Sequence, residues 1–245
     1  MLDDEITEVF EWGALNAAID SNAYKQAIPF PHIVIDNAFD HLALDNVLKA
    51  WPSMSENVEE HNDGLYVKKK FGTTHETQLS AHIRLFLNQL STPKFLIYLE
   101  KLTGIGALLP DPYNFGGGLH QTEVGGRLAI HADYNKHPKF KLDRRLNVLI
   151  YLNKKWDEAM GGELELWNNT MDQCDKKILP LFNRTVIFST TAISYHGQPN
   201  PVACPQNESR KSIALYYYSN GRPEESMSFG LEQSTVWKRR PVVGY

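Results

Sequence analysis

Apolar residues follow two different spacings along the chain, and the spacing changes near residue 110. Before this point they recur every three or four positions, which is the spacing of one face of a helix. The repeats predict helices over 44–51, 79–90 and 93–102. Asp40 is a capping residue for the first helix, Pro93 starts the last one, and Gly104 ends it. One short strand, at 32–35, interrupts this helical part.

After residue 110 the pattern is typical of strands. Short runs of β-branched and aromatic residues, with paired glycines between or near them, replace the helical repeats. These runs cover 128–131, 146–152, 163–167, 184–189 and 212–218. Helices first and strands afterwards predict an α+β fold, in which helices buttress one antiparallel sheet system. The strands suit a sandwich or a barrel, and the pattern does not choose between these two.

The composition is that of one globular domain without a surface for nucleic acid. The chain has 245 residues, of which 42% are hydrophobic and 22% charged, and its net charge is -4. A negative net charge gives no field that collects nucleic acid or anionic lipid. The basic run Lys68-Lys69-Lys70 is interpreted as a solvated face. No apolar stretch reaches the roughly 18 residues of a membrane span, so no membrane association is expected.

The cysteines and the first residues of the chain predict a cytoplasmic protein. Cys174 and Cys204 match no metal or redox spacing, and so few cysteines in a chain of this length indicate a reducing compartment. The chain begins with acidic residues, whereas a signal peptide begins with basic ones.

Three residues are candidates for a metal site. His131 and Asp133 are two positions apart on a predicted strand, so their side chains share one face. His196 follows another strand-like run. Two histidines and a carboxylate on neighbouring strands can form the facial triad of iron(II) oxygenases, which leaves open positions for other ligands. Alone the signal is weak, because a chain with nine histidines contains such combinations by chance, and a hydrogen-bonded structural pair is the alternative.

A second pair of residues suits the binding of a carboxylate. Arg210 and Ser212 lie on one face of a strand that begins shortly after His196. A guanidinium fork pairs bidentately with a carboxylate, and a neighbouring hydroxyl adds a hydrogen bond. The alternative is a solvent-exposed arginine at a strand end.

The stretch from Leu119 to Tyr218 resembles the catalytic domain of the prolyl-hydroxylase-like oxygenases that depend on iron(II) and 2-oxoglutarate. The matching segments occur in the order of that family and near its spacing. They are Leu-Ala-Ile-His131-Ala-Asp133, Arg145-Leu-Asn-Val-Leu-Ile-Tyr151-Leu-Asn153, Trp156, Gly161-Gly162-Glu-Leu164-Glu-Leu, His196 and Arg210-Lys-Ser-Ile-Ala-Leu-Tyr-Tyr-Tyr.

The resemblance implies a double-stranded β-helix, of the jelly-roll or cupin kind, with helices that buttress it. It implies that His131, Asp133 and His196 hold iron. It also implies that residues of the neighbouring strands bind 2-oxoglutarate, namely Arg210 with Ser212, Tyr151 through a hydrogen bond and Leu164 through packing. The chain, 1–245, is then one oxygenase domain with a helical support over 1–110, a catalytic core over 111–220 and a C-terminal extension over 221–245.

The sequence departs from this family at two places. The interval between His196 and Arg210 is longer than in the animal oxygen-sensing prolyl hydroxylases. Where those enzymes have a further tyrosine for the co-substrate, this chain has Gln121, which can still donate a hydrogen bond. The carboxylate of Asp133 distinguishes the chain from related iron halogenases, which have a small residue there, and favours hydroxylation.

Substrate contacts are expected near the mouth of the barrel. The candidates are His120, Tyr134, Arg144 and Arg145, each of which can equally be a strand-end residue. The segment 64–76 lies between helical patterns and is interpreted as either a mobile flap or an ordinary exposed loop.

The resemblance further implies the reaction and its participants. Iron(II), 2-oxoglutarate and oxygen, with ascorbate as reductant, would hydroxylate an unactivated C–H bond and release succinate and carbon dioxide. A prolyl or other peptidyl residue is the expected substrate, and a free amino acid or small metabolite is the alternative. Two other classes of protein stay open, a non-catalytic binding module and a zinc hydrolase. Intact metal ligands disfavour the first, and a hydrolase needs no anchor for a dicarboxylate.

Overall fold

The computed structural model describes residues 8–53, 59–61, 63–73, 79–223 and 234–241. The α-helices are α1 (Ala17–Gln26), α2 (His41–Lys49), α3 (Ala81–Gln89) and α4 (Pro93–Thr103), and η2 (Glu158–Met160) is a 3-10 helix. The strands before residue 140 are β1 (His32–Asp36), β2 (Glu59–His61), β3 (Val67–Thr73), β4 (Leu109–Pro110) and β5 (Gly118–Ala132). The later strands are β6 (Asp143–Tyr151), β7 (Leu164–Trp167), β8 (Cys174–Ile178), β9 (Arg184–Ser189), β10 (His196–Gln198), β11 (Arg210–Ser219) and β12 (Val236–Trp237). No helix among the described residues is long and apolar enough to cross a membrane.

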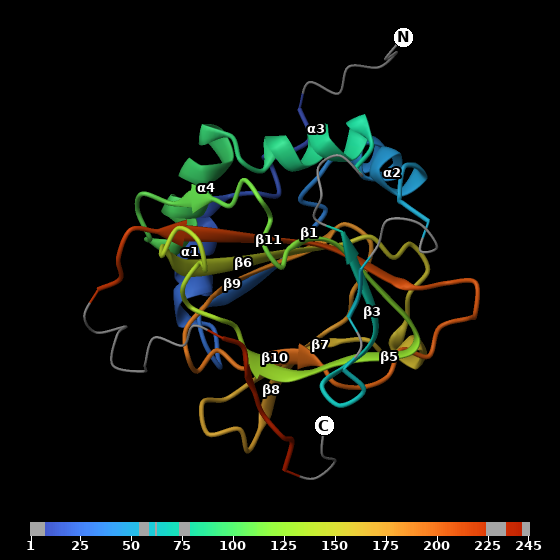
Figure 1. Ribbon diagram of the computed structural model, residues 1–245. Helices are drawn as coiled ribbons and strands as arrows, with labels where there is room; N and C mark the ends of the chain where they lie inside the picture. Colours follow the sequence, from blue (N-terminus) through green and yellow to red (C-terminus); the bar gives the residue numbers. More distant parts are fainter. Residues whose placement is uncertain (1–7, 54–58, 62, 74–78, 224–233, 242–245) are drawn as a thin grey trace.

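Two facing layers of antiparallel strands enclose the interior of the barrel (Figure 1). β1, β9, β6 and β11 lie side by side in one layer, and β10, β7 and β8 lie in the other. β5 belongs to both layers, because its first part pairs with β11 and its last part with β10. This arrangement is the predicted double-stranded β-helix.

A glycine pair lets β5 pass from one layer to the other. Gly125 has a left-handed φ of 78°, which favours glycine, and a Cβ on Gly126 would meet the carbonyl oxygen of Glu123 at 2.8 Å. The pair stands between the part of β5 that contacts β11 and the part that contacts β10. These glycines, which the sequence placed between or near strands, therefore form a bend inside one long strand.

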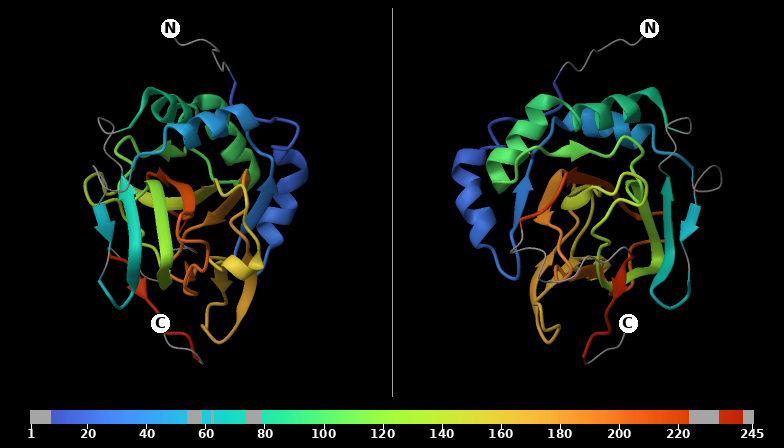
Figure 2. Two further views of the ribbon diagram at one scale, coloured as in Figure 1. Left: turned by 90° about the vertical axis from the view of Figure 1, so that its right-hand side faces the viewer. Right: turned by 60° about the vertical axis from the view of Figure 1, so that its left-hand side comes forward.

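The helices cover the outer face of the layer that contains β6 and β11 (Figure 2). The side chains of β11 point alternately to the two faces of this layer, as in any strand. Ile213, Leu215 and Tyr217 pack into the core beneath the helices, and the intervening residues line the barrel interior. The helical half thus supports the sheet from outside and leaves its inner face for polar side chains.

The first half of the chain contains more strands than the sequence predicted. The predicted strand corresponds to β1, and α2, α3 and α4 correspond to the predicted helices, with the side chain of Asp40 capping α2 at 2.8 Å from the Ala43 nitrogen. The segment 64–76, however, is not simply a flap or an exposed loop, because residues 67–73 form β3, which pairs with β5. Positions 74–76 lie outside the described residues. Three consecutive lysines stand between its apolar residues Val67 and Phe71, which explains why the pattern missed this strand.

Candidate metal and co-substrate site

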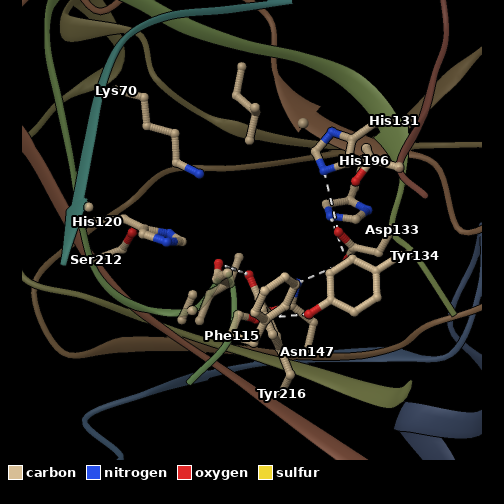
Figure 3. Close-up of a pocket in the computed structure, with 18 of the residues that line it drawn as sticks. Lys70, Phe115, His120, His131, Asp133, Tyr134, Asn147, His196, Ser212 and Tyr216 are labelled. Atoms are coloured by element: carbon tan, nitrogen blue, oxygen red, sulfur yellow. Dashed lines mark hydrogen bonds and ion pairs between the residues drawn. The ribbon is translucent and has the colours of Figure 1, made fainter. Parts of the chain in front are cut away.

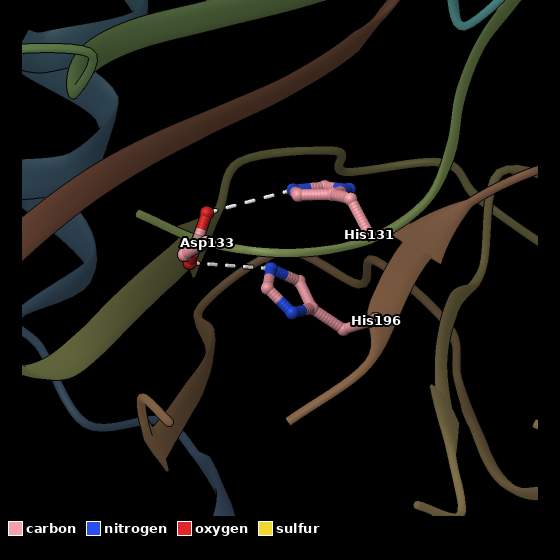
Figure 4. A group of neighbouring side chains, drawn as sticks. All are labelled: His131, Asp133 and His196. Carbon is pink, nitrogen blue, oxygen red and sulfur yellow. Dashed lines mark ion pairs between the residues drawn. The ribbon is translucent and has the colours of Figure 1, made fainter. Parts of the chain in front are cut away.

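Three buried side chains meet at the inner end of β5 (Figure 4). His131 is near the end of β5, Asp133 follows the strand directly, and His196 begins β10, which pairs with β5 at His131. The Nε2 atoms of His131 and His196 each lie 3.5 Å from an oxygen of Asp133. One potential ligand atom from each residue lies within 4.8 Å of the other two. The structure therefore brings the predicted triad together.

Backbone carbonyl groups fix the orientation of both imidazole rings. His131 Nδ1 lies 2.8 Å from the Ala129 oxygen, and His196 Nδ1 lies 2.9 Å from the Ser194 oxygen. A carbonyl oxygen only accepts hydrogen bonds, so each Nδ1 carries the proton. The lone pair of the neutral ring is then on Nε2, toward the centre of the triad. This is the usual support of a histidine that binds a metal.

Arg144 and Asn147 hold the carboxylate of the triad. Arg144 Nη2 donates to Asp133 Oδ2 at 2.7 Å, and Asn147 Nδ2 donates to the same oxygen at 3.3 Å. The Arg144 guanidinium is buried and lies over the rings of Tyr216 and Tyr134, with its central carbon 3.4 and 4.7 Å from their centroids. Arg144 is therefore an ion-pair partner of Asp133. Because it also lines the cavity, its role as a substrate contact stays a prediction.

The charges of the triad suit a divalent cation. Desolvation raises the pKa of Asp133, but the nearby charge of Arg144, followed by the effects of His196 and His131, more than offsets this and holds that pKa well below its usual range. Burial lowers the pKa of His196 to about 4. At neutral pH the site therefore offers one carboxylate and a neutral imidazole at His196. Two histidines and one carboxylate are the donor set of non-haem iron(II) sites, so the residues fit iron(II).

The predicted carboxylate anchor lies in the same cavity. Arg210 is 8% exposed and donates from Nε to the Gly162 oxygen at 2.6 Å and from Nη2 to the Tyr151 hydroxyl at 3.3 Å. Among the described residues it has no carboxylate partner. Burying a guanidinium with only neutral partners is unfavourable unless an anion binds there. The remaining N–H groups of Arg210, with the hydroxyl of Ser212 on the same face, suit the distal carboxylate of 2-oxoglutarate.

The strand register places the side chains of this anchor. Arg210 and Ser212 line the cavity, whereas Lys211 between them bonds to Ser209 Oγ at 2.6 Å outside it. Leu164 also lines the cavity, and Tyr151 is fully buried, where desolvation raises its pKa and keeps the hydroxyl protonated.

The cavity has a volume of about 1030 Å³ and is partly open to solvent. Figure 3 shows a close-up of it. Lys70, His120 and Ser212 stand on one side of it, and the triad stands on the other. Tyr134 lines the cavity and donates its hydroxyl to the Phe115 oxygen at 2.8 Å. This volume is at the upper end of the range for small-molecule sites, about 300–1,000 Å³, so it has room for a co-substrate and a substrate side by side.

Two predicted contacts point elsewhere. Gln121 accepts a hydrogen bond from Trp51 Nε1 at 3.0 Å and does not line the cavity, so it is not placed to bind the co-substrate. In the register, Gln121 is opposite Lys211 on the outer face, while its neighbour His120 is opposite Ser212 on the inner face. Arg145 donates to the hydroxyl of Ser219 at 2.8 Å, outside the cavity. The register of β6 and β11 shifts next to this position, which turns Arg144 inward instead.

Several cavity residues were not predicted, namely Lys70, Thr122, Asn147, Tyr216 and Trp237. Thr122 and Tyr216 share the strand faces of His120 and Arg210, so alternation would have found them. Trp237 lies on β12, directly opposite His131, and its ring centroid is 5.1 Å from that of His131. No sequence signal indicated that the C-terminal segment returns to the site.

Comparisons with known proteins agree with this geometry. Residues 117–218 match the 2OG-Fe(II) oxygenase superfamily. Prolyl 3-hydroxylase OGFOD1 of Mus musculus is 24% identical over 220 residues, which are 81% of this chain, and the chain spans only 36% of that protein.

Two solved structures show the same fold. A Pseudomonas putida prolyl-4-hydroxylase has a TM-score of 0.59 and 12% identity, over 84% of this chain and 100% of the other. A Trichoplax adhaerens prolyl hydroxylase, in complex with a peptide fragment of the hypoxia inducible factor oxygen degradation domain, has a TM-score of 0.59 and 17% identity, over 85% and 93%.

Proposed function

We propose that this chain, a member of the 2OG-Fe(II) oxygenase superfamily through residues 117–218, is a hydroxylase that uses iron(II), 2-oxoglutarate and oxygen. The observation that carries the proposal is the presence of two complementary features in one cavity. One is the buried triad of His131, Asp133 and His196, and the other is Arg210, a buried cation without an anion among the described residues. A zinc hydrolase or a binding module has no use for both.

The protein's own residues would position the reactants. The Nε2 atoms of His131 and His196 and a carboxylate oxygen of Asp133 would hold the metal on one face, with Arg144 keeping the carboxylate charged and in place. Arg210, with Ser212, would hold the distal carboxylate of 2-oxoglutarate. This arrangement leaves the opposite end of the co-substrate free to reach the metal.

The bound iron and 2-oxoglutarate would supply the oxidation, in which one oxygen atom enters a substrate C–H bond and the other enters succinate as carbon dioxide leaves. The protein's part is to exclude water around this step. Leu164 lines the cavity, and the buried Tyr151 packs in the same apolar cluster as Leu164. Trp237 lines the cavity beside His131, and its ring stacks on that of Tyr66 with centroids 4.8 Å apart. Ascorbate would serve as the reductant that keeps the iron in its iron(II) state.

We infer a prolyl or other peptidyl residue as the substrate. The relatives are prolyl hydroxylases by name, and one of their structures contains a peptide. The size of the cavity and its opening to solvent also suit a segment of chain better than the co-substrate alone. A free amino acid or small metabolite is the alternative.

Mass spectrometry tests the proposal directly. The protein is incubated with iron(II), ascorbate, 2-oxoglutarate, ¹⁸O₂ and proline-containing peptides, and with free amino acids in parallel. The proposal predicts ¹⁸O in one product and a matching amount of succinate. Succinate without labelled peptide but with a labelled amino acid would support the alternative substrate. Absence of succinate from a metal-loaded, folded protein would contradict the proposed reaction.

A further inference from the structure

Lys70 extends from β3 into the cavity of the triad (Figure 3). It ends the run Lys68-Lys69-Lys70, in which the other two lysines are exposed. Lys69 has a left-handed φ of 47°, and the register between β3 and β5 shifts between Lys68 and Lys70. This bulge turns Lys70 inward. Lys70 therefore departs from the solvated face that the sequence suggested, whereas Lys68 and Lys69 belong to it.

The register gives Lys70 a place beside the co-substrate anchor. Lys70 is opposite Thr122 of β5, and Thr122 is opposite Arg210 of β11. All three side chains line the cavity. Two strand spacings, about 10 Å, separate the backbones of the two cations. The ammonium group of Lys70 faces the space between His120 and the triad, where a substrate would approach the metal.

The charges of the cavity leave Lys70 without a counter-ion. Asp133 is the one acidic side chain among the described residues that line the cavity, and it is ion-paired with Arg144 at 2.7 Å. Lys70 has no ion-pair partner in the described part of the chain. Burial lowers the pKa of Lys70 to about 8, with Asp133 opposing the shift and Arg210 adding to it, so the ammonium group is still mostly protonated at pH 7.

We propose that Lys70 binds a carboxylate of the substrate, so that the preferred substrates carry a carboxylate close to the hydroxylated carbon. This inference rests on the proposed function, in which Arg210 and the metal already hold the two carboxylates of 2-oxoglutarate. Apart from the exposed Lys139, Lys70 is then the remaining cation of the cavity, and a substrate carboxylate would compensate its charge. The carboxylate belongs either to an acidic side chain next to the target residue or to the free end of an amino acid or peptide.

Two matched pairs of probes test this proposal and distinguish the two sources. One pair is acetyl-Ala-Glu-Pro-Ala-amide and acetyl-Ala-Gln-Pro-Ala-amide, and the other is acetyl-Ala-Pro with a free carboxylate and its amide. Their affinities are measured by calorimetry on protein loaded with manganese(II) and 2-oxoglutarate under argon. The variants are Lys70→Met, which keeps the length of the side chain, Lys70→Glu, and the control Lys68→Met at an exposed position of the same strand. The affinity for 2-oxoglutarate is measured on each protein as well.

The expected result is that wild-type protein binds the carboxylate member of at least one pair about fivefold or more tightly than its neutral partner. Lys70→Met should remove this preference and Lys70→Glu should reverse it, while Lys68→Met keeps it, and 2-oxoglutarate affinity should stay unchanged in Lys70→Met. No preference in either pair, or a preference that persists in Lys70→Met, would overturn the proposal. A loss of 2-oxoglutarate affinity in Lys70→Met would also overturn it, because Lys70 would then bind the co-substrate. Wild-type protein that binds no 2-oxoglutarate would instead contradict the proposed function itself.

Discussion

Replacement of Arg210 by alanine is expected to weaken the binding of 2-oxoglutarate strongly and the binding of metal hardly at all. Arg210 is buried, and its neutral partners, the Gly162 carbonyl and the Tyr151 hydroxyl, orient it in advance of binding. Removing one partner of a buried charge pair costs about 2–5 kcal/mol. Because Tyr151 and Ser212 remain, we expect the lower part of this range, about 2–3 kcal/mol, which is a loss of roughly 30- to 150-fold in affinity.

Calorimetric titration of 2-oxoglutarate into manganese-loaded protein under argon measures this loss. Arg210→Lys should recover only part of it, because a point charge does not reproduce the planar fork. Lys211→Ala is the matched control, since its ammonium group bonds to Ser209 on the other face of β11 and should leave the affinity unchanged. Unchanged affinity in Arg210→Ala, or a large loss in Lys211→Ala, would refute the assignment of the anchor.

Three further predictions probe the site. Arg144→Met should leave the charge of Asp133 buried without its partner, which should destabilise the fold by about 3–5 kcal/mol and lower the affinity for manganese at least tenfold in a titration. Arg145→Met is the control and should leave the affinity for manganese unchanged. Equal affinities in the two variants would contradict the ion-pair role of Arg144. Tyr151→Phe should lower 2-oxoglutarate affinity by about five- to tenfold in calorimetry, since one hydroxyl is lost, and no change would exclude that hydroxyl from the site. Metal-free protein should lose stability in urea as the pH falls from about 6.5 to about 4, because burial lowers the pKa of His196 and the unfolded chain binds the proton more readily. This loss should be smaller in His196→Asn, and equal losses would show that another group causes it.

The sequence was sufficient to predict the groups that follow strict alternation. His131 and Asp133 were paired because residues two apart share a strand face, and the same reasoning paired Arg210 with Ser212. Period and capping likewise predicted α2 and α4. These inferences depend only on the spacing of residues along one helix or strand, which can be read from the sequence.

Lys70 and Arg144 were missed where the strand register departs from strict alternation. The bulge at Lys69 turns Lys70 inward, and the shift beside Arg145 brings Arg144 to the metal site. A register irregularity depends on the partner strand, so a pattern along one strand does not predict it. Gln121 is the complementary case, because the resemblance to the family gives its position in the sequence but not the face of β5 on which its side chain lies.

The central claim, that the triad holds a metal for a 2-oxoglutarate-dependent oxidation, is tested most directly by oxygen uptake. Metal-free protein receives iron(II) or zinc, with and without 2-oxoglutarate, in an oxygen electrode, and succinate is measured at the end. The account predicts oxygen uptake only with iron(II) and 2-oxoglutarate together, in proportion to succinate, and none in folded His131→Ala or His196→Ala. Turnover at the wild-type rate in either variant, or uptake that does not depend on 2-oxoglutarate, would contradict it.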